Sequence, residues 1–428
     1  MEDYFESIKG YEDIKKELYM YVDAINRQQE YRDLGIRPEK GLIITGRQGT
    51  GKTMMANAMI KALGRELFVC RKTRSGGEFV DEIADVFCEA ADHQPAVVLL
   101  EDIDRFSNHE DPEDAEEYAV IESWMNEIQE KDADIYVIAT ARSLRRIPDS
   151  LLGVGRFAEG IATRMPREDE IEEIITHCLS KIGIDADVDQ VALTKILSGY
   201  SGDLPGIIID GAAKRVFFER REKIEMKDII DTYLDWKLGA RPLEAGVVNE
   251  ESKRLAYHEA GHVLVSELLN PGSVSIASIL KEKNQMTGAV EYDRPIEKSN
   301  TYDGIEANLK TSLAGKAAVE IVMGTADDGV DDDMKNAIGY ATALIDDLCA
   351  LGFQNMIEGD HDETVLENKN RRIETVLDTS YLATKRLIAK NRVVLDKLAS
   401  ELLDKSVLTY TDIQNVLKTN SMQSIDGR

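Results

Sequence analysis

Short apolar runs alternate with helix-like apolar spacing over the first 165 residues of the chain. Residues 41–45, 96–100 and 135–139 are mostly apolar runs of strand length. Elsewhere in this region, apolar side chains recur every three or four residues, as in an amphipathic helix; one such set is Ile14, Leu18, Tyr21 and Ile25. Strands that alternate with helices predict a parallel sheet with helices on both faces, and hence an α/β domain.

Helix-like spacing predominates from residue 166 onward. It predicts a small helical domain that ends near Trp236, after which Gly239-Ala240-Arg241-Pro242 is typical of a linker. Beyond the linker, residues 274–280 and 288–292 have the pattern of a two-stranded hairpin, and the other patterns are helical. We therefore expect three domains and a flexible tail, at 1–165, 166–240, 241–420 and 421–428.

The first predicted strand runs directly into a complete Walker A sequence, Gly46-Arg47-Gln48-Gly49-Thr50-Gly51-Lys52-Thr53. An apolar helix pattern follows it, which supplies the strand, loop and helix that the motif requires. The glycines let backbone N–H groups surround phosphates, Lys52 reaches the outer phosphates, and Thr53 binds magnesium. These eight residues are therefore the predicted nucleotide-binding loop.

The second predicted strand ends in the acidic sequence Glu101-Asp102-Ile103-Asp104. The carboxyl ends of parallel strands are where a nucleotide binds in such a sheet. There, Glu101 is expected to hold Mg²⁺ and Asp102 to orient the attacking water. The alternative is a loop that is merely capped by solvated acids.

A second catalytic motif is the sequence His258-Glu259-Ala260-Gly261-His262. If it is helical, His258 and His262 lie one turn apart on the same face, where two imidazoles can bind one metal ion. This is the H-E-x-x-H arrangement of zinc peptidases, in which the glutamate is the general base. Zinc held by two histidines and a carboxylate leaves one position for water, whose pKa falls to about 7. The alternative is a core helix with a buried histidine pair.

The third zinc ligand is less evident from spacing. The distance along the chain from His262 nominates Glu282, as in thermolysin-like peptidases. Those enzymes, however, place that glutamate on a helix, and Glu282 falls in the turn of the predicted hairpin.

The net charge and the cysteine spacing limit which partners and which cellular compartment we expect. The 428 residues include 52 Lys plus Arg and 80 Asp plus Glu, for a net charge of -28. Such an acidic surface repels nucleic acid and anionic lipid, so neither is an expected partner. The four cysteines form no C-x-x-C pair, and no stretch approaches the 18 or so apolar residues of a membrane-spanning helix. We expect a cytoplasmic protein without a transmembrane anchor.

The order of these motifs, from about residue 7 to 418, resembles that of FtsH-type AAA+ zinc metalloproteases. Four further phrases support the resemblance: Gly10-Tyr11-Glu12-Asp13, Gly155-Arg156-Phe157, Gly199-Tyr200-Ser201-Gly202-Asp203-Leu204 and Gly315-Lys316-Ala317-Ala318. The resemblance implies an α/β AAA+ P-loop domain with a helical lid, followed by a mainly α-helical zinc metallopeptidase domain. It also implies ATP, Mg²⁺ and Zn²⁺ as cofactors, a hexameric homo-oligomer, and protein substrates.

The resemblance also assigns roles to single residues. The family's third zinc ligand is an aspartate that opens a helix, and it matches Asp333, with Asp332 as the fallback and a helix N-cap as the alternative role. Arg156 matches one of two arginine fingers, which would reach the phosphate of a neighbouring subunit; its alternative role is an ordinary surface salt bridge. The other arginine-finger position carries Glu159.

Three departures from the family affect the motor. Glu101-Asp102 reverses the usual Asp-Glu order, which shifts the water-orienting group by about one methylene and can slow hydrolysis. Some other AAA+ members carry the same order, so activity is still expected. The sensor asparagine is replaced by Ala141 or Arg142, with Thr140 as a substitute hydrogen-bonding group. In the shortened pore loop Phe79 is either the substrate grip or a core side chain. These departures leave open an alternative function, a nucleotide-gated remodelling or assembly factor with weak or absent threading.

Overall fold

The computed structural model describes ten stretches of the chain: 4–36, 39–73, 77–108, 115–158, 160–246, 248–282, 285–293, 301–325, 331–348 and 363–420. The chain divides into two compact units. The first comprises Met1–Ile182 and Leu197–Ile207, and the second comprises Gly183–Ile196 and Ile208–Arg428. The predicted tail at 421–428 lies outside the described residues.

A five-stranded parallel sheet forms the centre of the first unit, in the order β2-β3-β4-β1-β5. The strands are β1 (Gly41–Thr45), β2 (Glu66–Arg71), β3 (Ala96–Glu101), β4 (Ile135–Ala141) and β5 (Gly160–Ala162). The three strands expected from apolar runs, β1, β3 and β4, are confirmed. The two others lie at the edges of the sheet and have exposed side chains. In β2 the apolar run is only four residues long, between Glu66 and Arg71, and β5 has only three residues in all.

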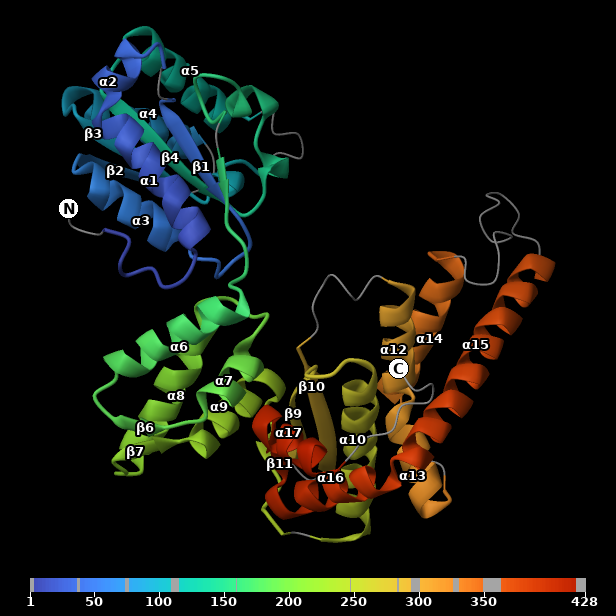
Figure 1. Ribbon diagram of the computed structural model, residues 1–428. Coiled ribbons are helices and arrows are strands. Elements are labelled where there is room, and N and C mark those ends of the chain that lie inside the picture. The colour runs from blue at the N-terminus through green and yellow to red at the C-terminus, as the bar shows by residue number, and fades with distance from the viewer. Residues whose placement is uncertain are drawn as a thin grey trace. The chain divides into compact units, whose positions relative to one another are not determined.

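Helices cover both faces of this sheet, as the alternating pattern predicted (Figure 1). On one face, α1 (Glu12–Asn26) and α3 (Lys52–Leu63) pack over Val97 and Leu99 of β3. On the other face, α4 (Gly77–Asp92) and α5 (Glu116–Glu130) pack over Val98 and Leu100. Because successive strand residues point to opposite faces, a buried strand with two covered faces is apolar throughout. The remaining helices of this region are α2 (Gln28–Asp33) and α6 (Glu168–Lys181).

The chain from residue 183 to 242 carries the helices α7 (Gln190–Leu197), α8 (Leu204–Phe218) and α9 (Met226–Leu238). Two short strands, β6 (Asp185–Asp187) and β7 (Lys223–Glu225), pair in parallel. Gly239 ends α9 with a left-handed φ of 63°. The predicted linker is more ordered than expected, because β8 (Arg241–Pro242) pairs with Lys281 and Leu280.

A central helix and a small sheet organise the rest of the second unit. The helix is α10 (Glu250–Leu269), and it packs against α13, α16 and the sheet. In the sheet, β9 (Val274–Glu282) lies between β10 (Gln285–Tyr292) and β11 (Val407–Thr409). The other helices are α12 (Tyr302–Ser312), α13 (Ala314–Met323), α14 (Asp331–Asp346), α15 (Glu363–Lys390), α16 (Arg392–Lys405) and α17 (Tyr410–Thr419). The expected hairpin and the mainly helical character are both confirmed.

Reciprocal hydrogen bonds begin α10. Asn249 Oδ1 accepts from the Ser252 N–H at 2.8 Å, and Ser252 Oγ accepts from the Asn249 N–H at 2.8 Å. Such a capping box stabilises a helix by about 1 kcal/mol. The helix is buried on most sides from Ala256 to Glu267, so its two histidines lie inside the domain.

The described residues contain no helix that is both long enough and apolar enough to cross a membrane.

Candidate active sites

Three side chains from two helices meet in the second unit. The Nε2 atoms of His258 and His262, on α10, lie 3.1 Å apart. Each lies 3.0 Å from Oδ2 of Asp333, in the first turn of α14. Among the described residues, these three form the one cluster of His, Cys, Asp or Glu with metal-ligand spacing.

A backbone carbonyl group orients the imidazole ring of His262. Its Nδ1 lies 2.8 Å from the carbonyl oxygen of Thr311, at the end of α12. Because a carbonyl can only accept, Nδ1 carries the proton and Nε2 keeps a lone pair that faces His258 and Asp333. The sequence pattern gave no sign of this contact, which depends on how α12 packs on α10.

Two glycines leave the space that the cluster occupies. A Cβ on Gly315 of α13 would overlap Nε2 of both histidines. A Cβ on Gly288 of β10 would overlap Oε1 of Glu259. Glu259 follows His258 on α10 and is 5% exposed. The hairpin edge and α13 can therefore approach the cluster only through glycine.

The cluster fits a zinc ion in both donor chemistry and charge. It offers two imidazole nitrogens and one carboxylate oxygen, a donor set that zinc uses in catalytic sites with a fourth position for water. Burial alone would raise the pKa of Asp333, but hydrogen bonds with the two histidines hold it well below its usual range. The Asp333 carboxylate is thus an anion at neutral pH. Asp333 also lines a cleft of about 700 Å³, together with Gly288 and Tyr292.

The other two candidates for third ligand are placed differently. The Asp332 side chain is exposed and its Oδ1 accepts from Lys335 Nζ at 2.9 Å. Glu282 is the last residue of β9, and its side chain lies outside the described part of the structure. The geometry therefore favours Asp333.

The Walker A residues form a loop between β1 and α3, as predicted. Gly46, Gly49 and Gly51 all have positive φ angles, of 147°, 77° and 86°, which side chains disfavour. Lys52 is 8% exposed, and its Nζ donates to the carbonyls of Gly46 and Arg47 at 2.8 and 2.9 Å. Burial lowers the pKa of Lys52, and Asp102 opposes this shift.

The two acids at the end of β3 point to different surroundings. Asp102, with Lys52 and Thr53, lines a cavity of about 470 Å³ beside the loop. Glu101 instead forms an ion pair with Arg71, at the matching position of the neighbouring strand β2. In the magnesium role expected for Glu101, the metal and Arg71 would therefore compete for this carboxylate, whose Oε2 Arg71 contacts. Sequence reasoning missed this contact.

Structure also distinguishes the candidates for the sensor position. Ala141 is fully buried in β4, whereas Arg142 lines the cavity. The Thr140 hydroxyl accepts from the Asp102 N–H at 3.0 Å. Thr140 thus fixes the backbone of Asp102, and Arg142 is the side chain at this edge that can reach a bound nucleotide.

The side chain of Arg156, the candidate arginine finger, and that of Phe79, the candidate substrate grip, both contact residues of this chain. The Arg156 guanidinium lies 2.9 Å from Glu122 and donates to Asn126 at 3.0 Å, both on α5. Phe79 is fully buried and packs edge-on against Phe106 at 5.0 Å, so it is a core side chain. The second finger position, Glu159, and Gly76 of the pore loop lie outside the described residues.

Two parts of the chain match known protein families. Residues 42–165 match the ATPase family associated with various cellular activities (AAA). Residues 246–416 match peptidase family M41. The first match covers the sheet and the phosphate-binding loop, and the second covers the histidine cluster.

Similarity to whole proteins extends over nearly all of the chain. The chain is 24% identical to the ATP-dependent zinc metalloprotease FtsH of Parabacteroides distasonis, over 96% of this chain and 64% of the relative. It is 28% identical to FtsH 2 of Symbiobacterium thermophilum, over 96% and 74%, and 25% identical to FtsH of Acholeplasma laidlawii, over 99% and 70%. The chain therefore spans about two thirds to three quarters of the length of these relatives.

Proposed function

We propose that this chain is an ATP-dependent zinc metalloendopeptidase. It joins an AAA ATPase domain to a peptidase family M41 domain, and therefore belongs with the FtsH-type proteins. The observation that carries the proposal is the approach of His258, His262 and Asp333 to within 3.1 Å of one another beside Glu259. The alternative, a nucleotide-gated remodelling or assembly factor with weak or absent threading, does not by itself account for this cluster.

In the peptidase reaction, His258, His262 and Asp333 would hold the metal. Zinc, when bound, polarises the scissile carbonyl and lowers the pKa of water. The carboxylate of Glu259 takes a proton from the attacking water and passes it to the leaving amine. Gly288 keeps space open for that carboxylate, and the Thr311 carbonyl fixes the orientation of His262.

In the ATPase reaction, the loop from Gly46 to Thr53 holds the phosphates. Lys52 would exchange its two carbonyl partners for phosphate oxygens. Thr53 and Glu101 would hold Mg²⁺, with Glu101 giving up its contact with Arg71. Asp102 orients the attacking water. In a ring, Arg156 leaves Glu122 to stabilise the phosphate of the neighbouring subunit.

The proposal also covers the oligomeric state of the protein, its location in the cell and its domain boundaries. We infer a homo-hexamer in the cytoplasm that acts on protein substrates. Cys70 and Cys88 carry free thiols, which supports a reducing compartment, and Cys349 lies outside the described residues. The domains are 1–165, 166–240 and 241–420.

The substitution Glu259→Gln tests the peptidase half directly. It removes the proton acceptor but retains the size of the side chain, so casein cleavage should fall by at least about 100-fold. ATP hydrolysis, zinc content and thermal stability should not change. The matched control, Glu250→Gln, alters an exposed glutamate in the first turn of the same helix and should leave cleavage intact.

The outcome that rejects this assignment is continued casein cleavage by the Glu259→Gln protein. A second comparison separates threading from simple cleavage, with an unstructured peptide and a stably folded tagged protein as substrates. ATP-driven cleavage of the folded protein supports the full function. Cleavage of the peptide alone, regardless of ATP, would support a ring that does not thread.

A further inference from the structure

The cavity beside the phosphate-binding loop extends well beyond the loop itself. One end is lined by Gly49, Lys52 and Thr53, which precede or begin α3. The other end is lined by the segment before α1 and by α6, through Ser7, Ile8, Lys9, Tyr11, Ile174 and His177. Because phosphates bind at the loop and the first turn of α3, the second end is left for the nucleoside.

Two buried polar atoms at this nucleoside end have no hydrogen-bond partner among the described residues, the hydroxyl of Tyr11 and Nε2 of His177. Tyr11 is only 4% exposed. Its hydroxyl lies 3.5 Å from where a Cβ on Gly202 would be, and Gly202 lines the same cavity. Burying a hydroxyl without a partner costs free energy, so such a group calls for a reason.

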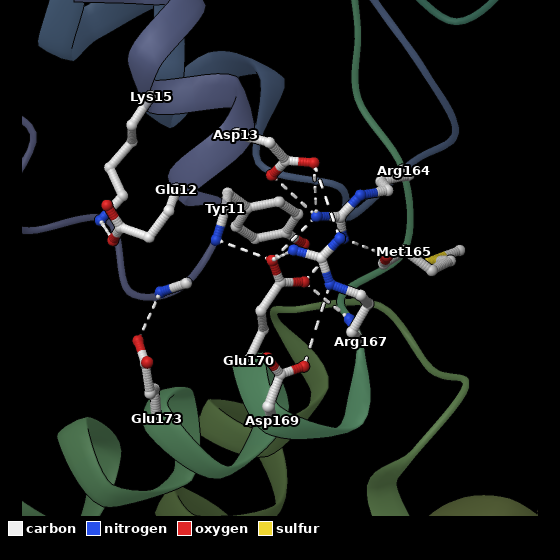
Figure 2. A network of polar contacts seen from close by, with 11 residues as sticks. Tyr11, Glu12, Asp13, Lys15, Arg164, Met165, Arg167, Asp169, Glu170 and Glu173 are labelled. Atoms are coloured by element: carbon white, nitrogen blue, oxygen red, sulfur yellow. Dashed lines mark hydrogen bonds and ion pairs between the residues drawn. The ribbon is translucent and has the colours of Figure 1, made fainter.

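The backbone of Tyr11 is held in an unfavourable conformation. Its φ and ψ are 60° and 36°, in the left-handed region that a bulky residue rarely adopts. Its N–H donates to Glu170 Oε1 at 3.0 Å, and the Gly10 N–H donates to Glu173 Oε2 at 2.9 Å. Figure 2 shows both carboxylates reaching up from α6 to this segment. Strain that neighbouring groups maintain in this way is typical of ligand-binding positions.

The Arg164 guanidinium completes the support of the Tyr11 side chain (Figure 2). It lies 5.3 Å from the centre of the Tyr11 ring, and it donates to Glu170 at 2.6 Å and to Asp13 at 2.9 Å. These contacts restrain the ring, whose hydroxyl is buried. Burial raises the pKa of Tyr11 to about 12, so the hydroxyl keeps its proton at neutral pH.

We propose that Tyr11 is a nucleotide-binding residue, whose hydroxyl hydrogen-bonds the nucleoside half of bound ATP or ADP. Arg164 and Glu170 are positioning residues that hold Tyr11 in place for this contact. The inference rests on the proposed ATPase function, and it adds to that function a contact outside the Walker A loop.

The substitution Tyr11→Phe tests the contact, because it removes only the hydroxyl and leaves the ring, the Arg164 contact and the backbone conformation. The dissociation constant of ADP, measured by calorimetry on the full chain, should rise about five- to tenfold. Competition by inorganic tripolyphosphate, which has no nucleoside, should stay unchanged. The thermal stability of the nucleotide-free protein should stay equal or rise, because the variant buries no unpaired hydroxyl.

Tyr31→Phe is the matched control in the same unit. Its hydroxyl already donates to Asp23 Oδ2 at 2.9 Å on the surface formed by α1 and α2, so ADP affinity should equal that of the wild type. Equal ADP affinity of the wild type and the Tyr11→Phe protein would overturn the inference while leaving the ATPase function intact. An equal loss of tripolyphosphate binding would also overturn it, by showing a general structural defect. A wild-type chain that does not bind ADP would remove both the inference and the ATPase function.

Discussion

At the scale of single residues, both sites depend on small side chains and backbone atoms as much as on the groups that react. Gly288 and Gly315 exclude a Cβ where Glu259 and the two histidines need room. The Thr311 carbonyl determines which nitrogen of His262 carries the proton. Such supporting contacts set the geometry within which a catalytic group can work.

Replacing Gly288 with alanine should impair cleavage without unfolding the domain. The added Cβ overlaps Oε1 of Glu259 and displaces the carboxylate by about 1 Å, which can cost on the order of 100-fold in rate. ATP hydrolysis should not change. Steady-state cleavage of an unstructured peptide, with zinc content measured alongside, checks this expectation.

Gly339→Ala is the control for that variant. Gly339 lies on α14, the helix that carries Asp333, and a Cβ there meets nothing within 4 Å. Alanine is a better helix former, so this variant should be more stable by roughly 0.5 to 1 kcal/mol and fully active. Full activity of the Gly288→Ala protein would show that Glu259 does not need the position it has here.

The ion pair between Arg71 and Glu101 gives a prediction for the motor. If Glu101 holds magnesium, Arg71→Ala frees it, and the magnesium concentration for half-maximal ATP hydrolysis should fall by up to about fivefold. The fivefold limit corresponds to about 1 kcal/mol, the upper end of the roughly 0.2 to 1 kcal/mol that an exposed ion pair contributes. This range applies because the Arg71 side chain is largely exposed. Titration of ATPase activity with Mg²⁺ measures the shift.

Lys131→Ala serves as the charge-matched control, because Lys131 pairs with Glu127 on the surface and does not line the cavity. Its magnesium dependence should equal that of the wild type. A higher magnesium requirement in the Arg71→Ala protein would mean that Arg71 supports the site instead of competing for Glu101.

At the scale of elements, the sequence predicted the central strands of the large sheet, whose side chains are almost all buried, together with the hairpin and the amphipathic helices. The strands β1, β3 and β4 are covered on both faces, and their apolar runs revealed them. β2, β5, β8 and β11 are short or lie at an edge, and their pairing depends on partners far away in the sequence. A local pattern contains no information on such partners, which is why β8 was taken for a linker.

A network of charged groups links α1, the segment that follows β5, and α6 (Figure 2). Glu170 opens α6 and accepts from Arg164 and from the Tyr11 and Arg167 N–H groups. Burial alone would raise its pKa, but these donors lower it to about 2 from the ordinary 4.5. A carboxylate with a lowered pKa stabilises the fold above its unfolded-state pKa, and this contribution is lost as the pH falls from about 4.5 toward 2.

Glu170→Gln should therefore destabilise the chain in a pH-dependent way. At pH 7 the loss should be about 3 kcal/mol, from the pKa shift of Glu170, and at pH 3 it should be less than half of that. Urea unfolding of the wild type and the variant at both pH values measures the difference. A loss that does not depend on pH would show that the charge of Glu170 is not what the network uses.

At the scale of the whole molecule, one chain carries two sites with different chemistry, one in each compact unit. The sequence predicted both sites, because each rests on a short motif within one loop or one helix. It left the third zinc ligand open between Asp333, Asp332 and Glu282, since that choice depends on how α14 packs near α10. It also did not predict that Arg71 pairs with Glu101, or that Tyr11 lines the nucleotide cavity, because these contacts join distant parts of the chain.

The zinc content of the purified Asp333→Ala and Asp332→Ala proteins tests the central claim most directly. The account predicts about one zinc per chain in the wild type and in the Asp332→Ala protein, because Asp332 pairs with Lys335. The Asp333→Ala protein should lose zinc and peptidase activity and should retain ATP hydrolysis. Full zinc content and cleavage in the Asp333→Ala protein would contradict the claim that His258, His262 and Asp333 hold the catalytic metal.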